Sequence, residues 1–384
     1  MLRVLLTGGG SGGHIYPLVA LAQSLQSIAE DVRLAYLGPR HPLNAELQEL
    51  NVSVYRLTSS KLRRYFSFAN ILDFPKFIWS ICEALAALYV LMPDIVFSKG
   101  GPGSFSVVLA ACFYRIPVLI HESDAVPGLT NRLSARFAKH IYIAFDATAE
   151  WFPPHKTTLA GNPIRRNLLA PGLDARGAKE QLRFSGEEPL ILILGGSQGA
   201  LRMNTLIFDN LKTFLDTAQV CHQVGDGNLR ESYALTQSFV KELGGVYAKK
   251  YRMVGSFDTR ELRKALTAAD VVISRAGAGA VFEIAAFGKP SLLVPLRDAA
   301  NDHQKMNAYV YAKSGACFVV EEENFTPHVV LTQIKKILEN TEMSRTMSES
   351  AKKFSRPEAA EFLARETLRW GTKGRLLPAQ NTAP

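Results

Sequence analysis

Two segments of the chain, one at its start and one near its middle, share the same order of residue types. Each begins with an apolar run, turns on glycine and resumes with helix-forming residues, as RVLLTGGGSGGHIYP (3–17) and LILILGGSQGALRMN (190–204). An apolar strand that turns into a helix in this way starts a βαβ unit of a parallel sheet. Further aliphatic runs follow helical stretches at 32–37, 95–98, 118–121 and 141–143. The chain is therefore predicted to be an α/β protein with parallel sheets wound with helices on both faces.

The length of the chain and a Gly-Asn-Pro break near its middle predict two domains. A chain of 384 residues can bury a separate core in each of two domains. A Gly-Asn-Pro break at 161–163 precedes a stretch of low apolar content, and we place the domain boundary there. The predicted parts are a first domain at 1–162, a second domain at 163–355, a helix at 356–370 that packs back on the first domain, and a disordered tail at 371–384.

Charge and cysteine content indicate which ligands and which cellular compartment suit the protein. The 44 Lys and Arg against 35 Asp and Glu give a net charge of +9, which favours phosphates, nucleic acid or acidic lipid head groups without choosing among them. Cys82, Cys112, Cys221 and Cys317 form no CxxC pair, so neither a zinc site nor a disulfide framework is indicated and a reducing cytosol fits. The first residues lack the apolar run of a signal peptide. Glu83 interrupts the longest apolar stretch, so we expect no membrane-spanning segment.

The first glycine turn, residues 8–13, is suited to binding a phosphate. Glycines let backbone N–H groups approach an anion, and the start of the next helix adds a favourable potential. A dinucleotide site needs a carboxylate after the second strand, where LAYLGPR (34–40) has none, and the lysine of a Walker loop is also missing. His14 is a candidate general base or phosphate ligand, or else it caps the turn. A second turn, SKGGPGSFS (98–106), follows another strand, and two such turns indicate a diphosphate ligand.

A third candidate ligand-binding segment lies at 274–308. The sequence predicts a glycine turn that opens a helix carrying Glu283, then a strand at 291–294, then a polar loop and helix with residues 301–304 and Asn307. In an α/β sheet the polar loop would lie at the edge where ligands bind. The pattern alone fits equally well an ordinary βαβ unit with a solvated loop.

The sequence lacks the residues of a metal-dependent sugar-nucleotide site. No Asp is followed two positions later by another Asp, and the scattered His, Asp and Glu have no metal-ligand spacing. We therefore expect no metal and no cofactor. The charge of a leaving diphosphate would be held by backbone N–H groups and by Arg165 and Arg275.

The segment 61–92 gathers basic and aromatic residues. Lys61, Arg63, Arg64 and Lys76 stand among six aromatic side chains, a mixture that suits an anionic bilayer surface. A buried helix with a basic loop is the alternative. The aromatic residues are Tyr65, Phe66, Phe68, Phe74, Phe77 and Trp79.

Together the motifs resemble one family over nearly the whole chain. TGGGSGGHIYP, KGGPGSFS, HES with GLTNR, AGNPIR, LGGSQGALRMN, SRAGAGAVFEIAAFGKPSLLVP and NDHQKMNA follow the order of the signature segments of the MurG family. These are bacterial UDP-N-acetylglucosamine transferases that complete lipid II. The resemblance implies a GT-B fold, in which two doubly wound Rossmann-like domains face across a cleft. The first domain would hold the acceptor and the second UDP-GlcNAc.

The resemblance also implies roles for individual residues. Glu283 would bind the ribose hydroxyls of UDP, and Arg165 would meet the diphosphate. The donor side would comprise Arg165, Ser197, Gln198, Arg275, Ala278, Glu283, His303, Gln304 and Asn307. The acceptor side would comprise Gly10, Ser11, Gly12, Gly13, Gly100, Gly101, Ser104, Asp124 and Asn131, with His14 as the candidate base or diphosphate contact.

The implied reaction is inverting transfer of GlcNAc from UDP-GlcNAc to the 4-hydroxyl of the MurNAc of lipid I. The implied partners are UDP-GlcNAc, lipid I and an anionic membrane surface, with no nucleic acid, and the implied place is the cytoplasmic face of the bacterial inner membrane, where the protein would be peripheral. Two departures affect the acceptor side: the usual HEQN is here His121-Glu122-Ser123-Asp124, and Pro102 replaces a usual tyrosine. The alternatives are a related GT-B transferase with another lipid or small aglycone acceptor, a sugar-nucleotide epimerase or hydrolase, and a non-catalytic nucleotide-binding protein of the membrane surface.

Overall fold

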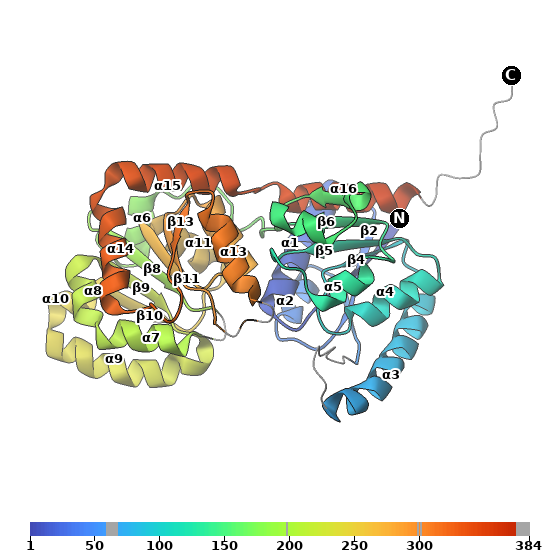
Figure 1. The fold of residues 1–384 in the computed structure, drawn as a ribbon, viewed down its shortest axis with the longest axis horizontal. Helices are drawn as coiled ribbons and strands as arrows, with labels where there is room; N and C mark the ends of the chain where they lie inside the picture. The colour runs from blue at the N-terminus through green and yellow to red at the C-terminus, as the bar shows by residue number, and fades with distance from the viewer. Residues whose placement is uncertain (59–67, 197–198, 298, 300–301, 374–384) are drawn as a thin grey trace, which may run out of the picture. The chain divides into compact units, whose positions relative to one another are not determined.

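The computed structural model describes residues 1–58, 68–196, 199–297, 299 and 302–373. The chain divides into two compact units (Figure 1). Unit 1 comprises Met1–Arg166 and the chain from Pro357 onward, and unit 2 comprises Asn167–Arg356. The predicted boundary between residues 162 and 163 lies just before this division, so Arg165 belongs to unit 1.

Unit 1 is built on a seven-stranded sheet in which every neighbouring pair of strands is parallel. The strand order is β3-β2-β1-β4-β5-β6-β7. The strands are β1 (Leu2–Thr7), β2 (Val32–Gly38), β3 (Ser53–Arg56), β4 (Ile95–Ser98), β5 (Val118–Glu122), β6 (His140–Ile143) and β7 (Thr157–Leu159). The helices are α1 (Gly12–Ile28), α2 (Asn44–Glu49), α3 (Phe68–Leu91), α4 (Ser104–Phe113), α5 (Leu129–Ser134) and α16 (Ala359–Lys373).

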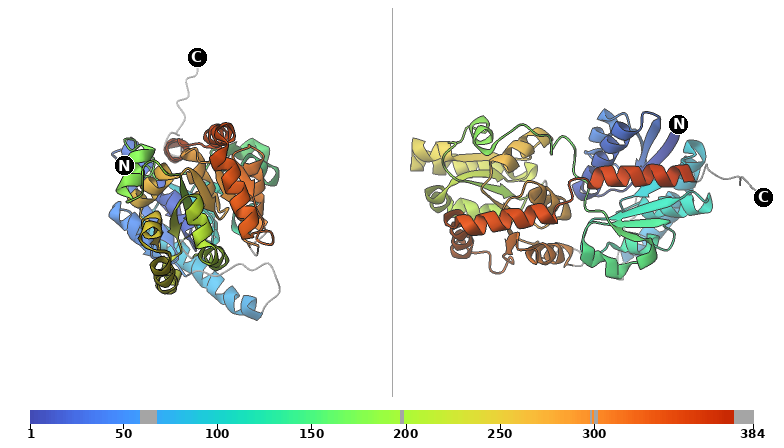
Figure 2. Two further views of the ribbon diagram at one scale, coloured as in Figure 1. Left: turned by 90° about the vertical axis from the view of Figure 1, so that its left-hand side faces the viewer. Right: turned by 90° about the horizontal axis from the view of Figure 1, so that it is seen from above.

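Helices cover both faces of this sheet because successive strand residues point to opposite sides. Val4 and Leu6 of β1 pack in one apolar core with residues of α1 and α16, whereas Leu5 packs in a second core with residues of α3 and α4. Figure 2 shows the helices of unit 1 on the two sides of its strands. The strands read as continuous apolar runs because both faces are buried.

Helix α16 returns the chain to unit 1. It packs against α1, β1 and β4, and Leu363 and Ala364 are buried in the core beneath α1. The hydroxyl of Tyr142 in β6 donates to Glu366 Oε2 at 2.7 Å. The helix was predicted at 356–370, whereas it runs from Ala359 to Lys373, and the rest of the predicted tail, 374–384, lies outside the described residues.

Unit 2 repeats the plan with a six-stranded parallel sheet of order β10-β9-β8-β11-β12-β13. Ile191 and Ile193 of the central strand β8 pack with α7, α8 and α14 in one core, while the intervening Leu192 is buried on the other face. The strands are β8 (Leu190–Leu194), β9 (Gln219–Gln223), β10 (Tyr251–Val254), β11 (Val271–Ser274), β12 (Ser291–Leu293) and β13 (Cys317–Val319). The helices are α6 (Ala175–Gln181), α7 (Leu201–Asp209), α8 (Leu211–Thr217), α9 (Leu229–Leu243), α10 (Gly245–Lys250), α11 (Thr259–Ala268), α12 (Ala278–Ala286), α13 (His303–Ala312), α14 (Pro327–Glu339) and α15 (Thr341–Phe354). The predicted pair of doubly wound Rossmann-like domains is confirmed.

Helix α3 corrects one expectation. The sequence suggested that Glu83 leaves no apolar stretch long enough to cross a membrane. In the structure, Phe74–Leu91 is an 18-residue helical stretch with a mean hydropathy of 1.4 and 17% burial, which meets that requirement by length and composition. The helix continues through Glu83, because glutamate is a good helix former. Its carboxylate accepts from Thr58 N at 2.7 Å and from Trp79 Nε1 at 2.8 Å.

Candidate active site

The first two glycine turns meet at the switch point of the unit 1 sheet. β1 and β4 are neighbours, yet their chain continuations run to opposite sides of the sheet, which is where parallel α/β sheets bind ligands. The turn after β1 and the turn after β4 are in close contact, because a Cβ on Gly101 would collide with the carbonyl oxygen of Gly9. A Cβ on Gly10, where φ is +98°, would lie 2.9 Å from Pro102 Cδ. The glycines are required because the two turns are packed backbone against backbone.

His14 lies where the two turns meet. It stands in the first turn of α1, and its Nδ1 is hydrogen-bonded to Ser11 Oγ at 2.9 Å. The Nε2 edge of its ring would lie 3.1 Å from a Cβ on Gly101, so the imidazole covers the second glycine turn. Ser11 therefore orients the ring, and the ring places a nitrogen beside both turns. This geometry suits a proton acceptor or a phosphate ligand.

The helices that start at the switch points are left without side-chain caps. α1 and α4 begin after Ser11 and Gly103, and α7 and α12 begin after Ala200 and Gly277, and none of these four residues caps its helix through its side chain. By contrast, α11 and α14 are capped by the side chains of Asp258 and Thr326. These two helices follow the outermost strands of unit 2. Uncapped backbone N–H groups and the positive end of the helix dipole favour an anion. Each unit thus presents two helix starts without a side-chain cap at its ligand edge, where an anion would be favoured.

A buried polar network supports the turn after β4. Glu122, at the end of β5, is 4% exposed and accepts from the backbone N–H groups of Asp124 and Gly128 and from Asn131 Nδ2, each at 3.0 Å. Burial raises the pKa of Glu122, and the neighbouring Asp124 raises it further. Asn131 in turn fills the space beside Gly100, where a Cβ would lie 2.6 Å from Asn131 Oδ1. The network fixes the conformation of the Gly100–Gly101 backbone.

The structure thus brings the predicted acceptor residues together at one edge of unit 1. Ser104 starts α4, and its hydroxyl donates to Gly101 O at 2.9 Å, so it closes the second turn. Gly12 packs on Tyr16 of α1, because a Cβ there would lie 3.2 Å from the ring. Gly10 and Gly13 are exposed, and Asp124 is half-buried after β5.

Arg165 lies in unit 1, although it was predicted to contact the donor. Its guanidinium stacks over the Tyr16 ring at 4.1 Å from the ring centre, and the side chain is 5% exposed. Its charge also lowers the pKa of Glu46 in α2, against the larger upward effect of burial. The structure therefore places Arg165 in unit 1, against α1, and its contact with the donor stays a prediction.

The switch point of unit 2 lies between β8 and β11. Arg275 directly follows β11, and its guanidinium makes an ion pair with Glu322 and donates to Val294 O at 3.2 Å. These contacts join the loops that follow β11, β12 and β13. Arg275 was predicted to hold the donor diphosphate, and that role stays a prediction; in the structure its guanidinium is paired with a carboxylate at the same edge of the sheet.

The other predicted donor residues lie on two helices of unit 2. Ala278 is the first residue of α12, and Glu283 is half-buried further along the same helix. On α13, His303 and Gln304 are half-buried, and Gln304 Oε1 accepts from Leu296 N at 3.1 Å. Asn307 is fully buried, and its Nδ2 donates to Ala276 O at 3.1 Å, which ties α13 to the turn before α12. Three predicted polar residues, Ser197, Gln198 and Asn301, lie outside the described residues.

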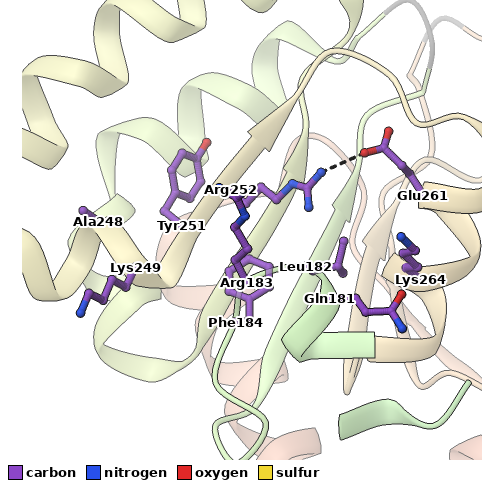
Figure 3. Close-up of a pocket in the computed structure, with 10 residues that line it drawn as sticks. All are labelled: Gln181, Leu182, Arg183, Phe184, Ala248, Lys249, Tyr251, Arg252, Glu261 and Lys264. Atoms are coloured by element: carbon purple, nitrogen blue, oxygen red, sulfur yellow. Dashed lines mark hydrogen bonds and ion pairs between the residues drawn. The ribbon is translucent and has the colours of Figure 1, made fainter. Parts of the chain in front are cut away.

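A separate cavity of about 680 Å³ lies in unit 2 (Figure 3). It opens beside the first residues of β10, and Arg183, Lys249, Arg252 and Lys264 are among its lining residues. Arg252 Nη2 makes a 2.9 Å ion pair with Glu261. This is the amino end of the strand, so the cavity is remote from the glycine turns, and none of the predicted site residues lines it.

Sequence reasoning gave no site role to three buried polar residues near the turns. Lys99, Ser123 and Asn162 each follow the carboxyl end of a strand of unit 1, after β4, β5 and β7. Each is buried. Their position within three residues of the ends of parallel strands was a usable signal, because such residues converge at one sheet edge. Among the described residues, no group of three or more His, Cys, Asp and Glu is placed to hold a metal ion.

Comparison with known proteins places this geometry in a family. Residues 4–143 match the glycosyltransferase family 28 N-terminal domain, and residues 190–363 match the glycosyltransferase family 28 C-terminal domain. The chain belongs to glycosyltransferase family 28. The two family 28 domains correspond to the two sheets, and the resemblance predicted from the motifs is confirmed.

Individual relatives of the family 28 chain carry more specific names. A protein of Shouchella clausii is 36% identical over 343 residues, which cover 88% of this chain and 91% of the relative. A protein of Bacillus cereus is 34% identical over 369 residues, which cover 94% of this chain and 98% of the relative. Both are named UDP-N-acetylglucosamine--N-acetylmuramyl-(pentapeptide) pyrophosphoryl-undecaprenol N-acetylglucosamine transferase. The crystal structure of MurG from Acinetobacter baumannii superimposes with a TM-score of 0.70 at 27% identity, covering 96% of this chain and 100% of that one.

Proposed function

We propose that this protein transfers N-acetylglucosamine from UDP-N-acetylglucosamine to the muramyl sugar of lipid I and so forms lipid II for peptidoglycan synthesis. The observation that carries the proposal is the name shared by relatives at 34–36% identity, which align over nearly their whole length. The paired anion-binding helix starts support it, because donor and acceptor each carry a diphosphate.

The donor is assigned to unit 2. The uncapped start of α12 suits the UDP diphosphate, and the Glu283 carboxylate on the same helix is an acceptor of the two ribose hydroxyls. Arg275 acts through Glu322: by joining three loops, it holds the turn before α12 in place. Asn307 has the same positioning role through Ala276.

The acceptor is assigned to unit 1. The facing turns after β1 and β4 expose backbone N–H groups at the starts of α1 and α4, and these would hold the diphosphate of the lipid. Arg165 lies beside the first turn of α1, stacked on Tyr16, so we assign its charge to the acceptor diphosphate.

The transfer is a displacement at the anomeric carbon. The 4-hydroxyl oxygen of the muramyl sugar forms a bond to C1 of N-acetylglucosamine, the bond from C1 to the diphosphate oxygen breaks, and UDP leaves with the electron pair. The configuration at C1 inverts. The hydroxyl proton goes to His14 Nε2, which carries the ring lone pair when Nδ1–H donates to Ser11 Oγ. The helix starts stabilise the negative charge that gathers on UDP.

The outer face of α3 is proposed to lie on an anionic membrane surface. Ser80, Ala84 and Leu88 form the buried stripe of this helix, and the helix packs along α4. Other large apolar side chains of the helix, among them Phe74 and Val90, are exposed. A helix with one stripe already packed on its own protein is suited to lie in the membrane interface, where the enzyme meets a polyprenyl lipid. The basic residues Lys61, Arg63 and Arg64 of the predicted patch, together with Tyr65 and Phe66, lie outside the described residues.

One product assay tests the function. The protein is incubated with UDP-GlcNAc and a short-chain lipid I analogue, and the products are analysed by mass spectrometry with and without EDTA. We expect the acceptor to gain one N-acetylhexosamine and UDP to be released in equal amount, in chelator as well. Free N-acetylglucosamine or N-acetylmannosamine without an acceptor product would instead indicate a hydrolase or epimerase.

A second assay tests the membrane surface. Val90→Ser should reduce sedimentation with vesicles that contain anionic lipid, because a 78% exposed side chain of α3 would no longer enter the interface. Val246→Ser in α10, a 71% exposed valine of unit 2, is the matched control and should sediment like the parent. Equal sedimentation of the parent and Val90→Ser would contradict the assignment of this face.

A further inference from the structure

Lys99 is a buried cation directly behind the two glycine turns. It follows β4, its side chain is 3% exposed, and its backbone N–H donates to Thr7 O at 2.8 Å at the end of β1. The stem of the side chain packs under the first turn, because a Cβ on Gly8 would lie 2.9 Å from Lys99 Cβ. The residue therefore touches the bases of both turns.

The ammonium group of Lys99 begins a chain of hydrogen bonds across three loops. Lys99 Nζ donates to Ser123 Oγ, and the Ser123 hydroxyl donates to Asn162 Oδ1 at 2.6 Å. Ser123 follows β5 and Asn162 follows β7, so a single chain of side chains connects the loops after β4, β5 and β7. All three residues are buried.

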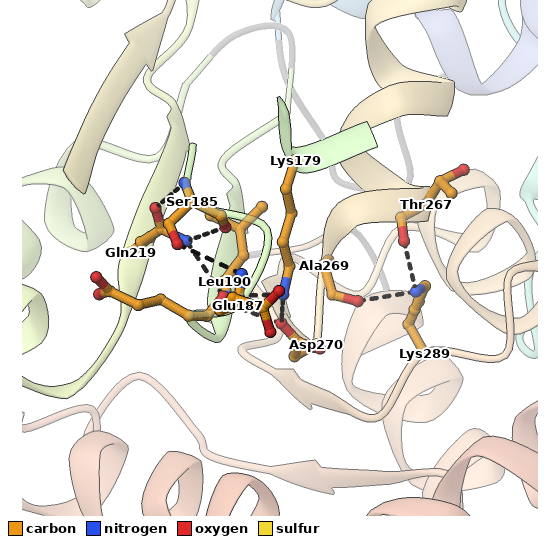
Figure 4. Close-up of polar contacts among 10 residues, drawn as sticks. Lys179, Ser185, Glu187, Leu190, Gln219, Thr267, Ala269, Asp270 and Lys289 are labelled. Carbon is orange, nitrogen blue, oxygen red and sulfur yellow. Dashed lines mark hydrogen bonds and ion pairs between the residues drawn. The ribbon is translucent and has the colours of Figure 1, made fainter. Parts of the chain in front are cut away.

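Burying the Lys99 ammonium carries a desolvation cost, which raises the question of what the charge does there. Removing a lysine charge from water has a large desolvation cost, and an apolar side chain would fill the same volume without that cost. Burial lowers the pKa of Lys99, while the carboxylates of Glu122 and Asp124 raise it and so favour the charged form. Two other lysines show the ordinary structural arrangement: Lys156 donates to the carbonyl oxygens of two residues, and Lys289 does the same in unit 2 (Figure 4).

We propose that Lys99 is a positioning residue for the acceptor diphosphate: through Ser123 and Asn162 it fixes the loops around the Gly100–Gly101 backbone, and its charge makes that backbone a stronger anion site. The inference rests on the proposed function and refines it. In this role Lys99 acts through Ser123, to which its ammonium donates, and it is not a catalytic residue. Its effect should therefore appear in acceptor binding and not in donor binding.

The test compares Lys99→Met, Ser123→Ala and the double variant in the full-length protein. Methionine keeps the length of the side chain and removes the charge. The KM of a short-chain lipid I analogue should rise at least tenfold in Lys99→Met, while the KM of UDP-GlcNAc stays within twofold. Ser123→Ala should raise the acceptor KM by a smaller factor, and the double variant should match Lys99→Met because the two side chains act as one chain. In Lys99→Met the acceptor KM should also depend less steeply on salt, since one positive charge is missing.

Lys156→Met is the matched control in the same unit. It removes a lysine that donates to Ala135 O at 2.6 Å and to Ala138 O at 3.3 Å, away from the glycine turns. It should lower the melting temperature and leave both KM values unchanged. Lys289→Met, which removes the lysine bound to Thr267 O and Ala269 O, is the equivalent control in unit 2.

The outcomes separate this inference from the function. If Lys99→Met melts earlier but keeps the parent's acceptor KM and salt dependence, Lys99 is a structural lysine and the inference is wrong. If Lys99→Met does not fold, Ser123→Ala decides, and an unchanged acceptor KM in that variant overturns the proposal. If the parent itself transfers no sugar to lipid I, the proposed function fails first, independently of Lys99.

Discussion

Gly101→Ala tests most directly whether the two glycine turns of unit 1 form one site. Gly101 has a φ of +88°, and an added Cβ would meet both Gly9 O and the His14 ring. A carbon and a carbonyl oxygen approach to about 3.3 Å, so the two turns must separate by on the order of 1 Å. A displacement of that size in a positioned site lowers turnover by roughly a hundredfold.

The loss of folding stability in Gly101→Ala has two parts, the backbone strain of alanine at a positive φ and the collision of its Cβ with the other turn. A left-handed conformation costs alanine about 1–2 kcal/mol relative to glycine. The collision adds an overpacking cost of about 1–3 kcal/mol. Gly244→Ala separates the two, because Gly244 has a φ of +87° and no heavy atom within 4 Å of the added Cβ. Gly244→Ala should therefore show the strain alone, which corresponds to a fall of about 2–8 °C in Tm.

The measurements are transfer to a lipid I analogue, UDP binding by calorimetry and thermal unfolding. We expect Gly101→Ala to lose about a hundredfold in transfer, to retain UDP affinity because unit 2 is untouched, and to unfold at a lower temperature than the parent. Gly244→Ala should transfer sugar at the parent rate. If Gly101→Ala transfers sugar within threefold of the parent and is destabilised no more than Gly244→Ala, the close approach of the turns has no functional meaning.

Three further substitutions test other parts of the molecule. His14→Ala should lower turnover by about 10² to 10⁴ if the imidazole accepts the hydroxyl proton, with UDP affinity unchanged; an active but destabilised enzyme would leave only a capping role. Glu283→Ala should weaken UDP binding by about 1.5–3 kcal/mol, since a carboxylate bonded to the ribose hydroxyls is lost, and calorimetry showing unchanged affinity would refute that assignment. Burial lowers the pKa of His222 to about 3, so its neutral form stabilises unit 2 above the ordinary pKa of 6.5 and this contribution is lost as the pH falls from 6.5 towards 3. His222→Gln should therefore lose roughly 2 kcal/mol less stability than the parent between pH 7 and pH 5, and parallel unfolding curves of the two proteins over that range would contradict the assignment.

The local pattern of the sequence predicted most of the fold. The strands expected at 32–37, 95–98, 118–121 and 141–143 agree with β2, β4, β5 and β6 to within one residue at each end. They were readable because both faces of a parallel sheet are buried, which leaves continuous aliphatic runs in the sequence. The glycine turns were readable for a similar reason: each directly joins a strand to the helix that follows.

Contacts between distant residues could not be read in the same way. The pattern around Arg275 gave no sign of its ion pair with Glu322, which follows a strand two positions further across the sheet. The hydrogen bonds from Lys99 through Ser123 to Asn162 could not be predicted either, because the three strand ends come together only when the sheet forms. Arg165 was assigned by its place after the Gly-Asn-Pro break, and its stacking on Tyr16 shows that the chain crosses to unit 2 after that residue.

The return of α16 to unit 1 determines the order in which the newly made protein can mature. Unit 1 needs both Met1–Arg166 and α16, and all of Asn167–Arg356 is translated in between. At roughly 5–20 residues per second, the ribosome takes about 10–40 s to make that intervening stretch. During this interval the apolar surface that Leu363 and Ala364 will cover is exposed on the nascent chain. Unit 2 can therefore complete its fold before unit 1 does, and unit 1 is finished only when α16 leaves the ribosome.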